Sequence, residues 1–262
     1  MLSLNIHGLA FLNLAGYFVL YSFLGWIMET AYAAWDEGHF VNRGFLNGPF
    51  CPVYGFGMVS LVVAMQPFLD NLPLLFLGVV VLTSVLEYIT GWFLELIFHH
   101  KWWDYSNRRF NVQGRICLRF SLYWGFGGIL LLKVVHPRIE ELVNRIPADI
   151  GTGLLAAAAL YLTADLIHTL VSLASLKSRL AEMHHFAQEA RETLELLKYS
   201  SQEVMEERLE ELRARYHHLW DRLSLGGDRL MKAFPNLRKL RLDYRLKDLL
   251  DNFEKSSRHA NR

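Results

Sequence analysis

The chain has 262 residues, of which 52% are hydrophobic, and its formal net charge is only +1. The near-neutral charge argues against a nucleic-acid-binding protein. The sequence contains no G-x-x-x-x-G-K-S/T, H-E-x-x-H or G-x-S-x-G motif, so it shows no sign of a P-loop nucleotidase, a zincin or a serine hydrolase. Its two cysteines, Cys51 and Cys117, lack metal-ligand spacing, and we expect neither a metal nor a cofactor.

Charge is distributed unevenly along the chain. Residues 1–176 hold nine Lys or Arg and eleven Asp or Glu, whereas residues 177–262 hold eighteen and fifteen. This contrast predicts two unlike parts, a transmembrane domain over 1–176 and a charged, helical cytoplasmic tail over 177–262. The fold class that we expect is all-α, a polytopic membrane helix bundle followed by a coiled-coil tail.

A helix needs about 20 mostly apolar residues to cross a bilayer. Five runs meet this requirement, at about 9–35, 50–69, 72–98, 117–135 and 150–176. No Lys or Arg precedes the first run, so we expect a retained helix and not a cleaved signal peptide. The short connection around Asp70 makes the second and third helices an antiparallel hairpin.

Basic residues in short loops predict the orientation in the membrane. The loop after the third run contains Lys101, Arg108, Arg109 and Arg115, and the segment after the fifth begins with Lys177 and Arg179. We therefore expect a multi-pass protein of the cell membrane, with the N-terminus outside and the tail in the cytoplasm. The loops after the first and third runs then lie on the same, cytoplasmic side.

Acidic side chains lie in or beside the apolar runs, where each costs roughly 2.5–3.5 kcal/mol at the bilayer centre on insertion scales. They are Glu29, Glu87, Glu95 and Asp165. Small residues share their helix faces, so the charges should face the bundle interior, either protonated or paired with arginine. The candidate partners are Arg43, Arg115 and Arg119. The alternative is that such ion pairs only fix the packing of the helices.

The loop after the first run is rich in residues that shape a backbone, namely Gly44, Gly48, Pro49, Pro52 and Gly55. Within it, Asn42 and Arg43 are candidates for holding an anionic or carbonyl group. Alternatively, the polar groups of this loop only satisfy the backbone of a tight turn.

The loop after the third run combines aromatic, amide and charged residues. The candidates for substrate binding are Trp103, Asp104, Tyr105, Asn111 and Arg115, followed by Arg119, and Gly114 is expected to shape the loop. Aromatic residues often form a belt at the membrane surface, which is the simpler interpretation of the rings. The arginines also suit a phosphate or carboxylate headgroup.

From Leu176 onward, apolar residues alternate in steps of four and three as far as Val204, and the pattern resumes at Met205 with an offset of one residue. This heptad pattern predicts a long helix that continues the fifth run without a break and ends at Gly226-Gly227. It should pair with a second copy, with the last segment of the chain or with a partner. The basic segment after Pro235 is expected either to lie on anionic lipid or to fold back on the long helix.

The segments FLGWIMET, FVNRGFLNGPFCPVYGFG, EYITGWFLE and WWDYSNRRFNVQGRICLRFSLYWG resemble the CmpB-type ABC-transporter permeases, a family named Putative ABC-transporter type IV. The resemblance covers roughly residues 14–128. It implies a permease-like subunit that works with a separate ATPase and dimerises through its spans or its tail.

Three hypotheses therefore stand. The first is a permease subunit with a polar site at the cytoplasmic side of the bundle. The second is an intramembrane enzyme that acts on or binds an anionic lipid headgroup, with carboxylates such as Glu29, Glu87 and Asp104 as acid or base groups. The third is a membrane scaffold that recruits a partner through its tail.

Overall fold

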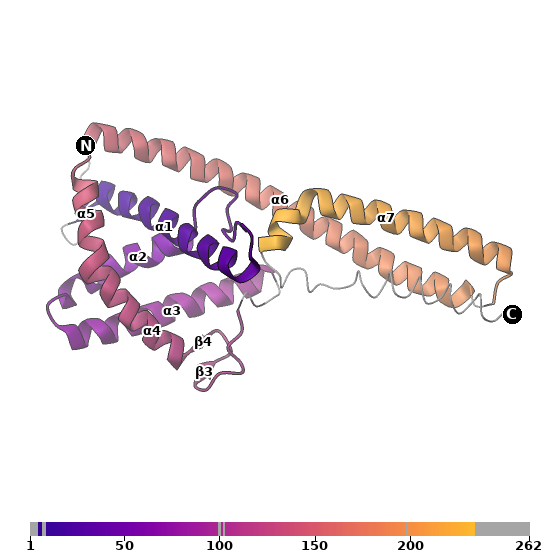
Figure 1. The fold of residues 1–262 in the computed structure, drawn as a ribbon, viewed down its shortest axis with the longest axis horizontal. Coiled ribbons are helices and arrows are strands. Elements are labelled where there is room, and N and C mark those ends of the chain that lie inside the picture. Colours follow the sequence, from indigo (N-terminus) through magenta and orange to yellow (C-terminus); the bar gives the residue numbers. More distant parts are fainter. Residues whose placement is uncertain (1–4, 7–8, 99–100, 102, 198, 234–262) are drawn as a thin grey trace. The chain divides into compact units, whose positions relative to one another are not determined.

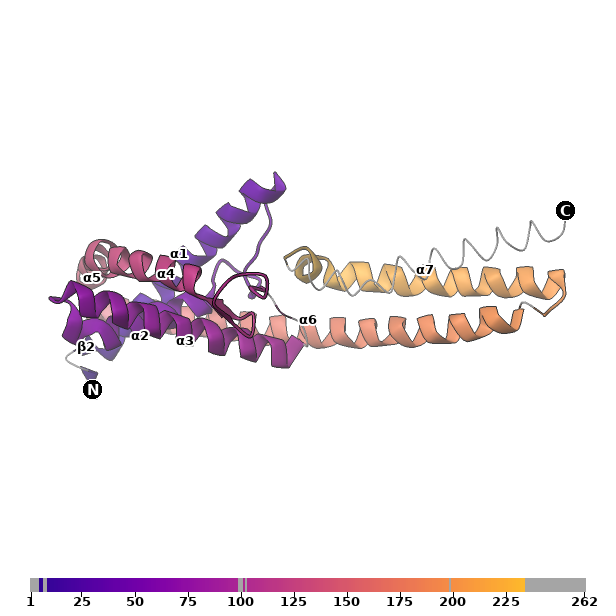
Figure 2. The same cartoon turned by 90° about the horizontal axis from the view of Figure 1, so that it is seen from below.

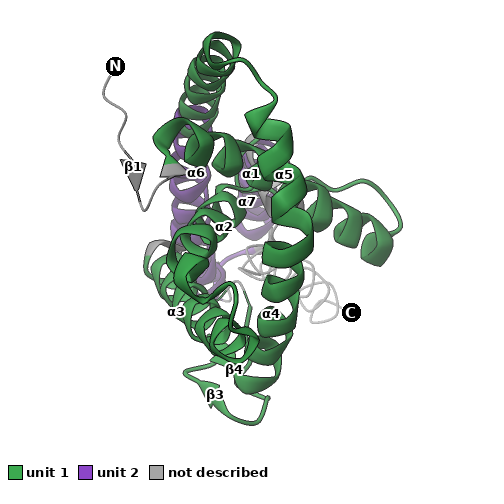
Figure 3. Cartoon of the chain, turned by 90° about the vertical axis from the view of Figure 1, so that its left-hand side faces the viewer, with its two compact units in different colours: residues 1–166 green, residues 167–262 purple. Residues whose placement is uncertain are grey.

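The computed structural model describes residues 5–6, 9–98, 101, 103–197 and 199–233. The chain forms two compact units, Met1–Leu166 and Ile167–Arg262 (Figure 3). Both units are built from helices, and the strands described are only two residues long. The basic segment after Pro235 lies outside the described residues.

The first unit, called unit 1, contains most of the helices (Figure 1). In chain order they are α1 (Phe11–Glu37), α2 (Pro52–Met65) with a 3-10 turn (Gln66–Phe68), α3 (Leu72–Phe98), α4 (Leu118–Leu130), a π-helical turn (Leu131–Val135), α5 (His136–Asn144) and the first part of α6 (Ala148–Leu197). Strands β1 (Asn5–Ile6) and β2 (Leu9–Ala10) pair before α1. Strands β3 (Asn111–Val112) and β4 (Ile116–Cys117) form a small antiparallel hairpin between α3 and α4.

Among the described residues, four helical segments are long and apolar enough to cross a membrane, whereas the sequence suggested five: Phe11–Glu37, Leu72–Leu96, Leu118–Asn144 and Ala148–Leu197. The helix over Pro52–Phe68 is apolar but shorter. Large apolar side chains point outward from these helices, such as Leu77 (58% exposed), Phe126 (67%) and Leu160 (75%). A surface of this kind suits lipid and not water. The prediction of an all-α, polytopic membrane helix bundle is confirmed.

The fourth spanning helix is longer than the sequence pattern indicated. We expected it to end near residue 135, but it continues to Asn144. Pro137 lacks an N–H group and would clash with the carbonyl one turn earlier in a regular α-helix. The π-helical turn just before it widens the helix, and the His136 N–H bonds to the Leu131 carbonyl. The helix therefore passes the proline without ending.

The core of unit 1 lies where α1, α2, α3 and the Leu118–Asn144 helix meet. Its fully buried members include Tyr17 and Leu75, and Leu61 and Leu132 are almost as buried. Helices α1 and α2 approach closely at glycine. A methyl group on Gly55 would overlap the Ser22 hydroxyl and lie 2.6 Å from the Phe18 carbonyl oxygen. This contact sets the position of the loop that joins α1 to α2.

In the second unit, called unit 2, the chain from Ile167 runs along α6 to Leu197 and returns along α7 (Gln202–Ala233) as a helical hairpin (Figure 2). The buried residues follow the heptad positions of the sequence: Met183, Ala187, Ala190, Leu194, Leu197, Met205, Leu209, Leu212, Tyr216 and Leu219, with Phe186 beside them. Ion pairs cross the hairpin from Arg215 to Glu189 at 2.8 Å and from Arg222 to Glu182 at 3.4 Å.

The fifth run continues without a break into the charged segment, as predicted, but the prediction that the same helix extends to Gly226-Gly227 is wrong. Helix α6 ends at Leu197, and Gly226 and Gly227 lie inside α7 and do not end it. The chain reverses close to the one-residue offset in the heptad pattern. Val204 is 46% exposed, whereas Met205 begins the buried positions of α7. Each half of the pattern finds its partner in the other half of the same chain.

Candidate functional site

The loop that joins α1 to α2 and the segment with β3 and β4 lie at the same end of unit 1, away from α5 (Figure 1). We call residues 38–51 the first loop, residues 101–117 the second loop, and this end of unit 1 the polar end. Most of the site residues expected from sequence lie here.

In the first loop, Asn42 organises the backbone. Its side-chain oxygen accepts hydrogen bonds from the Trp26 indole at 2.9 Å and from the Gly44 N–H at 3.0 Å. Its amide nitrogen donates to the Asn47 carbonyl at 2.8 Å. These contacts fit the simpler interpretation of Asn42, in which its side chain forms hydrogen bonds to backbone groups of the loop.

Asp165 of α6 receives the tip of the first loop. One carboxylate oxygen accepts from the Asn47 backbone and side-chain nitrogens at 3.0 and 3.1 Å, and the other accepts from the Gly48 N–H at 2.7 Å. Asp165 is only 9% exposed. Gly48 has no room for a side chain, because Tyr161 of α6 lies against it. The sequence placed Asp165 in a span but gave no sign that it anchors this loop.

The first loop holds its arginine away from the bundle carboxylates. Arg43 lies 3.5 Å from Glu37 and 5.7 Å from the centre of the Tyr32 ring. Glu29, which we expected to be either protonated or paired with an arginine, accepts a short hydrogen bond from the Tyr54 hydroxyl of α2. Tyr54 also packs against Gly25, so the small residue one turn before Glu29 makes this pairing sterically possible.

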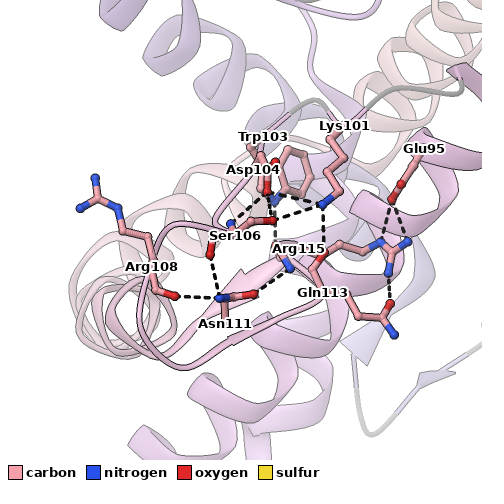
Figure 4. Close-up of polar contacts among 10 residues, drawn as sticks. Glu95, Lys101, Trp103, Asp104, Ser106, Arg108, Asn111, Gln113 and Arg115 are labelled. Carbon is pink, nitrogen blue, oxygen red and sulfur yellow. Dashed lines mark hydrogen bonds and ion pairs between the residues drawn. The ribbon is translucent and has the colours of Figure 1, made fainter.

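The second loop is built around Arg115 (Figure 4). Its guanidinium donates two hydrogen bonds to one oxygen of Glu95, at 3.0 and 2.7 Å, and a third to the Gln113 side chain. It also lies 5.3 Å from the centre of the Tyr88 ring. The predicted contact between a helix carboxylate and Arg115 is therefore present, and this guanidinium is largely occupied.

The turn of the second loop depends on local polar contacts. Gly114 has a φ of 72°, which favours glycine, and its N–H bonds to the Asn111 side chain at 3.0 Å. Asp104 accepts from the Ser106 N–H at 2.9 Å and from its hydroxyl at 2.5 Å. These bonds, together with the nearby Lys101 ammonium, hold the pKa of the exposed Asp104 carboxyl below its usual value. Asp104 and Asn111 thus shape the loop.

One face of α3 contacts the second loop and the first turns of α4. The sequence predicted that small and acidic residues share this face. Ser84 donates to the Ser121 hydroxyl of α4 at 2.8 Å, and Glu87 accepts from the Tyr105 hydroxyl at 3.2 Å. Gly91 lies against Trp103, whose indole donates to the Arg115 carbonyl at 2.8 Å. Burial and the Glu87 carboxylate raise the pKa of Tyr105, so its phenol stays a donor.

Some expected residues lie elsewhere or act differently. Arg119 is exposed at the start of α4, where its guanidinium donates to Tyr123 at 2.8 Å and pairs with no carboxylate in the described residues. Pro52 and Gly55 belong to α2, with Pro52 at its first turn. Pro49 lies in the first loop as expected.

Two similar pairs remain at the centre of the polar end: Glu29 with Tyr54, and Glu87 with Tyr105. The first pair joins α1 to α2, and the second joins α3 to the second loop. The second oxygen of Glu87 is buried and has no hydrogen-bond partner within 3.5 Å in the described part of the chain. Phenols and carboxylates in this arrangement can accept and pass on a proton or bind a hydrogen-bond donor. No group of three metal-ligating side chains occurs among the described residues.

The comparisons with known proteins agree with the helical spans. The family model described as Putative ABC-transporter type IV matches residues 16–170, which include most of α1, all of α2 to α5, both loops and Asp165. No curated protein and no solved structure matches the chain. The match covers more than half of the sequence, and the chain belongs to the Putative ABC-transporter type IV family.

Proposed function

We propose that this chain is the membrane-embedded permease subunit of a transporter, with the polar end of unit 1 as the site that meets the transported species. The observations that carry the proposal are two Glu–Tyr hydrogen bonds in unit 1, Glu29 with Tyr54 and Glu87 with Tyr105. Ionisable residues in a membrane are costly and are typical of substrate or ion pathways. The family and the spanning helices support the same reading.

The charges favour a cationic or proton-coupled species over an anion. Two of the three arginines that the sequence suggested for anion binding are engaged with carboxylates, Arg115 with Glu95 and Arg43 with Glu37, and the third, Arg119, lies at the surface on Tyr123. Glu29 and Glu87 accept hydrogen bonds from phenols, which carry no positive charge. A buried carboxylate without a cationic partner is stabilised by a proton or by a bound cation.

Energy for transport must come from elsewhere, because the sequence holds no P-loop. We propose a separate ATPase subunit as the partner, docked on the cytoplasmic side near the charged tail. The proposed orientation has the N-terminus outside and the polar end in the cytoplasm. It is tested by labelling His39→Cys and Asp70→Cys variants in intact cells with a membrane-impermeant maleimide, where only the Asp70→Cys variant should react.

The function is tested by purifying the tagged full-length chain from its native membranes and measuring ATP hydrolysis by the complex. The proposal requires a copurifying protein that contains a P-loop. Glu29→Gln and Glu87→Gln remove charge without changing shape, and should retain the partner while altering the ATPase rate and its pH dependence. Glu141→Gln, an exposed charge in α5, is the matched control.

Two other outcomes would favour the alternatives. A scaffold would lose protein abundance in the Glu29 and Glu87 variants, with no change in the ATPase rate per complex. An enzyme acting on an anionic headgroup would leave a lipid product depleted in a deletion strain, and a variant of Arg115 would reproduce that loss. The second alternative is less favoured, since Glu95 already occupies the Arg115 guanidinium.

A further inference from the structure

Helix α5 lies beside the end of α1 that is away from the polar end (Figure 1). A second group of polar side chains joins these two helices. Asn13, Tyr17 and Tyr21 follow one another at intervals of four residues, which places them on one side of α1. His136 and Glu140 share a side of α5 by the same spacing. None of these five residues belongs to the site described above.

His136 is fixed between the two tyrosines. Its ring Nδ1 lies 3.1 Å from the Tyr21 hydroxyl, and its ring packs edge-to-face on Tyr17 with 4.8 Å between the ring centres. Tyr17 is fully buried and Tyr21 is 3% exposed. The imidazole is thus held in one orientation within a spanning helix, and the π-helical turn before it sets its position. Turns of this kind recur at functional sites.

Tyr17 adds an observation that packing does not explain. Its hydroxyl is buried, and the described residues offer it no partner within 3.5 Å. Asn13, one turn earlier, donates its side-chain amide to Asn144 at 2.9 Å instead. An unsatisfied buried hydroxyl costs stability, so a phenylalanine would pack here at lower cost. The polar side chain near this hydroxyl is that of Asn13, which forms no hydrogen bond to it within 3.5 Å.

The titratable neighbours of His136 come from α1 and α5. Helix α1 supplies the phenols of Tyr17 and Tyr21, and α5 supplies the Glu140 carboxylate, one turn after His136 on the same helix. The buried residues that α2 and α3 bring to this cluster are apolar: Met58, Leu61, Val62, Met65, Leu75 and Val79. Glu140 is the only formal charge that these described neighbours present.

We propose that His136 is a proton-binding site of this protein, held by Tyr21 and Tyr17 and balanced by Glu140. In the neutral state, Nδ1 accepts the Tyr21 hydroxyl proton and Nε2 carries the ring proton. A proton taken from the aqueous side binds Nδ1, which then donates to the Tyr21 oxygen, while the Tyr21 hydroxyl turns toward another acceptor. No covalent bond other than the N–H bond forms, and the Glu140 carboxylate one helical turn away offers the nearest opposite charge on α5. The site stands apart from the proposed function of the polar end.

The test is nitrogen NMR of the full-length chain with labelled histidine in lipid nanodiscs, recorded from about pH 5 to pH 8, where imidazole titrates. His136→Gln identifies the His136 signals by their loss. In the wild type we expect a hydrogen-bonded Nδ1 that moves to the position of a protonated ring as the pH falls. His184→Gln, which removes an exposed histidine of unit 2, should leave these signals unchanged.

Two further variants keep the imidazole and protect the test against a misfolded His136→Gln protein. Tyr21→Phe should remove the hydrogen-bonded Nδ1 signal, and Glu140→Gln should move the midpoint of the titration. A His136 signal that is constant across this pH range would overturn the proposal. An Nδ1 signal that Tyr21→Phe leaves unaltered would also overturn it, because the hydrogen bond between Tyr21 and His136 would then not affect the ring nitrogen.

Discussion

The contact between α1 and α2 makes a quantitative prediction at Gly55. An alanine methyl group there would overlap the Ser22 hydroxyl and come within 2.6 Å of the Phe18 carbonyl oxygen, whereas ordinary contacts begin near 3.4 Å. The two helices must therefore separate by about 0.8 Å along this line. A gap of this size forfeits roughly a quarter to a half of each dispersion contact, and overpacking typically costs about 1–3 kcal/mol.

Gly57 is the matched control for this change. It lies in the same helix two residues later, and a methyl group there would meet nothing within 4 Å. Gly57→Ala should be neutral or stabilise the helix by up to about 1 kcal/mol, since alanine has the higher helix propensity. At about 2–4 °C per kcal/mol, Gly55→Ala should melt roughly 5–10 °C below Gly57→Ala. The assay is thermal unfolding of the full chain in detergent, followed by size-exclusion chromatography.

Equal melting temperatures for these two variants, within about 2 °C, would refute the reasoning. They would mean that α1 and α2 are not packed at this glycine, or that the interface relaxes without loss. Because the same contact positions the first loop, Gly55→Ala should also weaken whatever activity the polar end supports. Gly57→Ala should leave it intact.

Three further outcomes follow from the structure. Glu95→Gln should destabilise the chain by about 1–3 kcal/mol, because it leaves the largely buried Arg115 guanidinium without its carboxylate. The double variant with Arg at position 95 and Glu at position 115 should be more stable than the two corresponding single variants predict. Leu194→Ala should cost about 2–4 kcal/mol in unit 2, while Leu196→Ala, at a position 73% exposed, should cost less than about 0.5, which limited proteolysis of the full chain will report. The pKa of Asp104 is lowered in the folded protein, so its charged form stabilises the loop above the usual carboxyl pKa of about 3.9. This stabilisation is lost as the pH falls through the pKa of Asp104 in the folded protein. Tryptophan fluorescence should record a change at low pH that Asp104→Asn removes.

Much of the helical architecture was readable from the chain because it depends on local composition. The predicted third span, 72–98, coincides with α3 at both ends, and the first differs from α1 by two residues at each end. The face of α3 with Ser84, Glu87, Gly91 and Glu95 was predicted from spacing alone, since a helix has one fixed period. The heptad pattern likewise identified the buried side of unit 2.

The residues that contact those helix faces could not be predicted from the sequence. Glu29 was expected to be either protonated or paired with an arginine, and its partner is Tyr54, while Arg119 bonds to Tyr123 at the surface. The break in the heptad pattern was visible, but the reversal of the chain there was not. Sequence spacing says which residues share a side of an element, but a pairing between elements depends on their packing distance and rotation.

The sequence by itself determined the apolar spans, the charged tail, the two polar loops and the family, because hydropathy and motif residues are properties of short segments. Only the tertiary structure decided that Asp165 anchors the first loop, that Arg115 pairs with Glu95 and that His136 lies between Tyr17 and Tyr21. These facts join residues up to 118 positions apart, and such contacts exist only once the helices have packed.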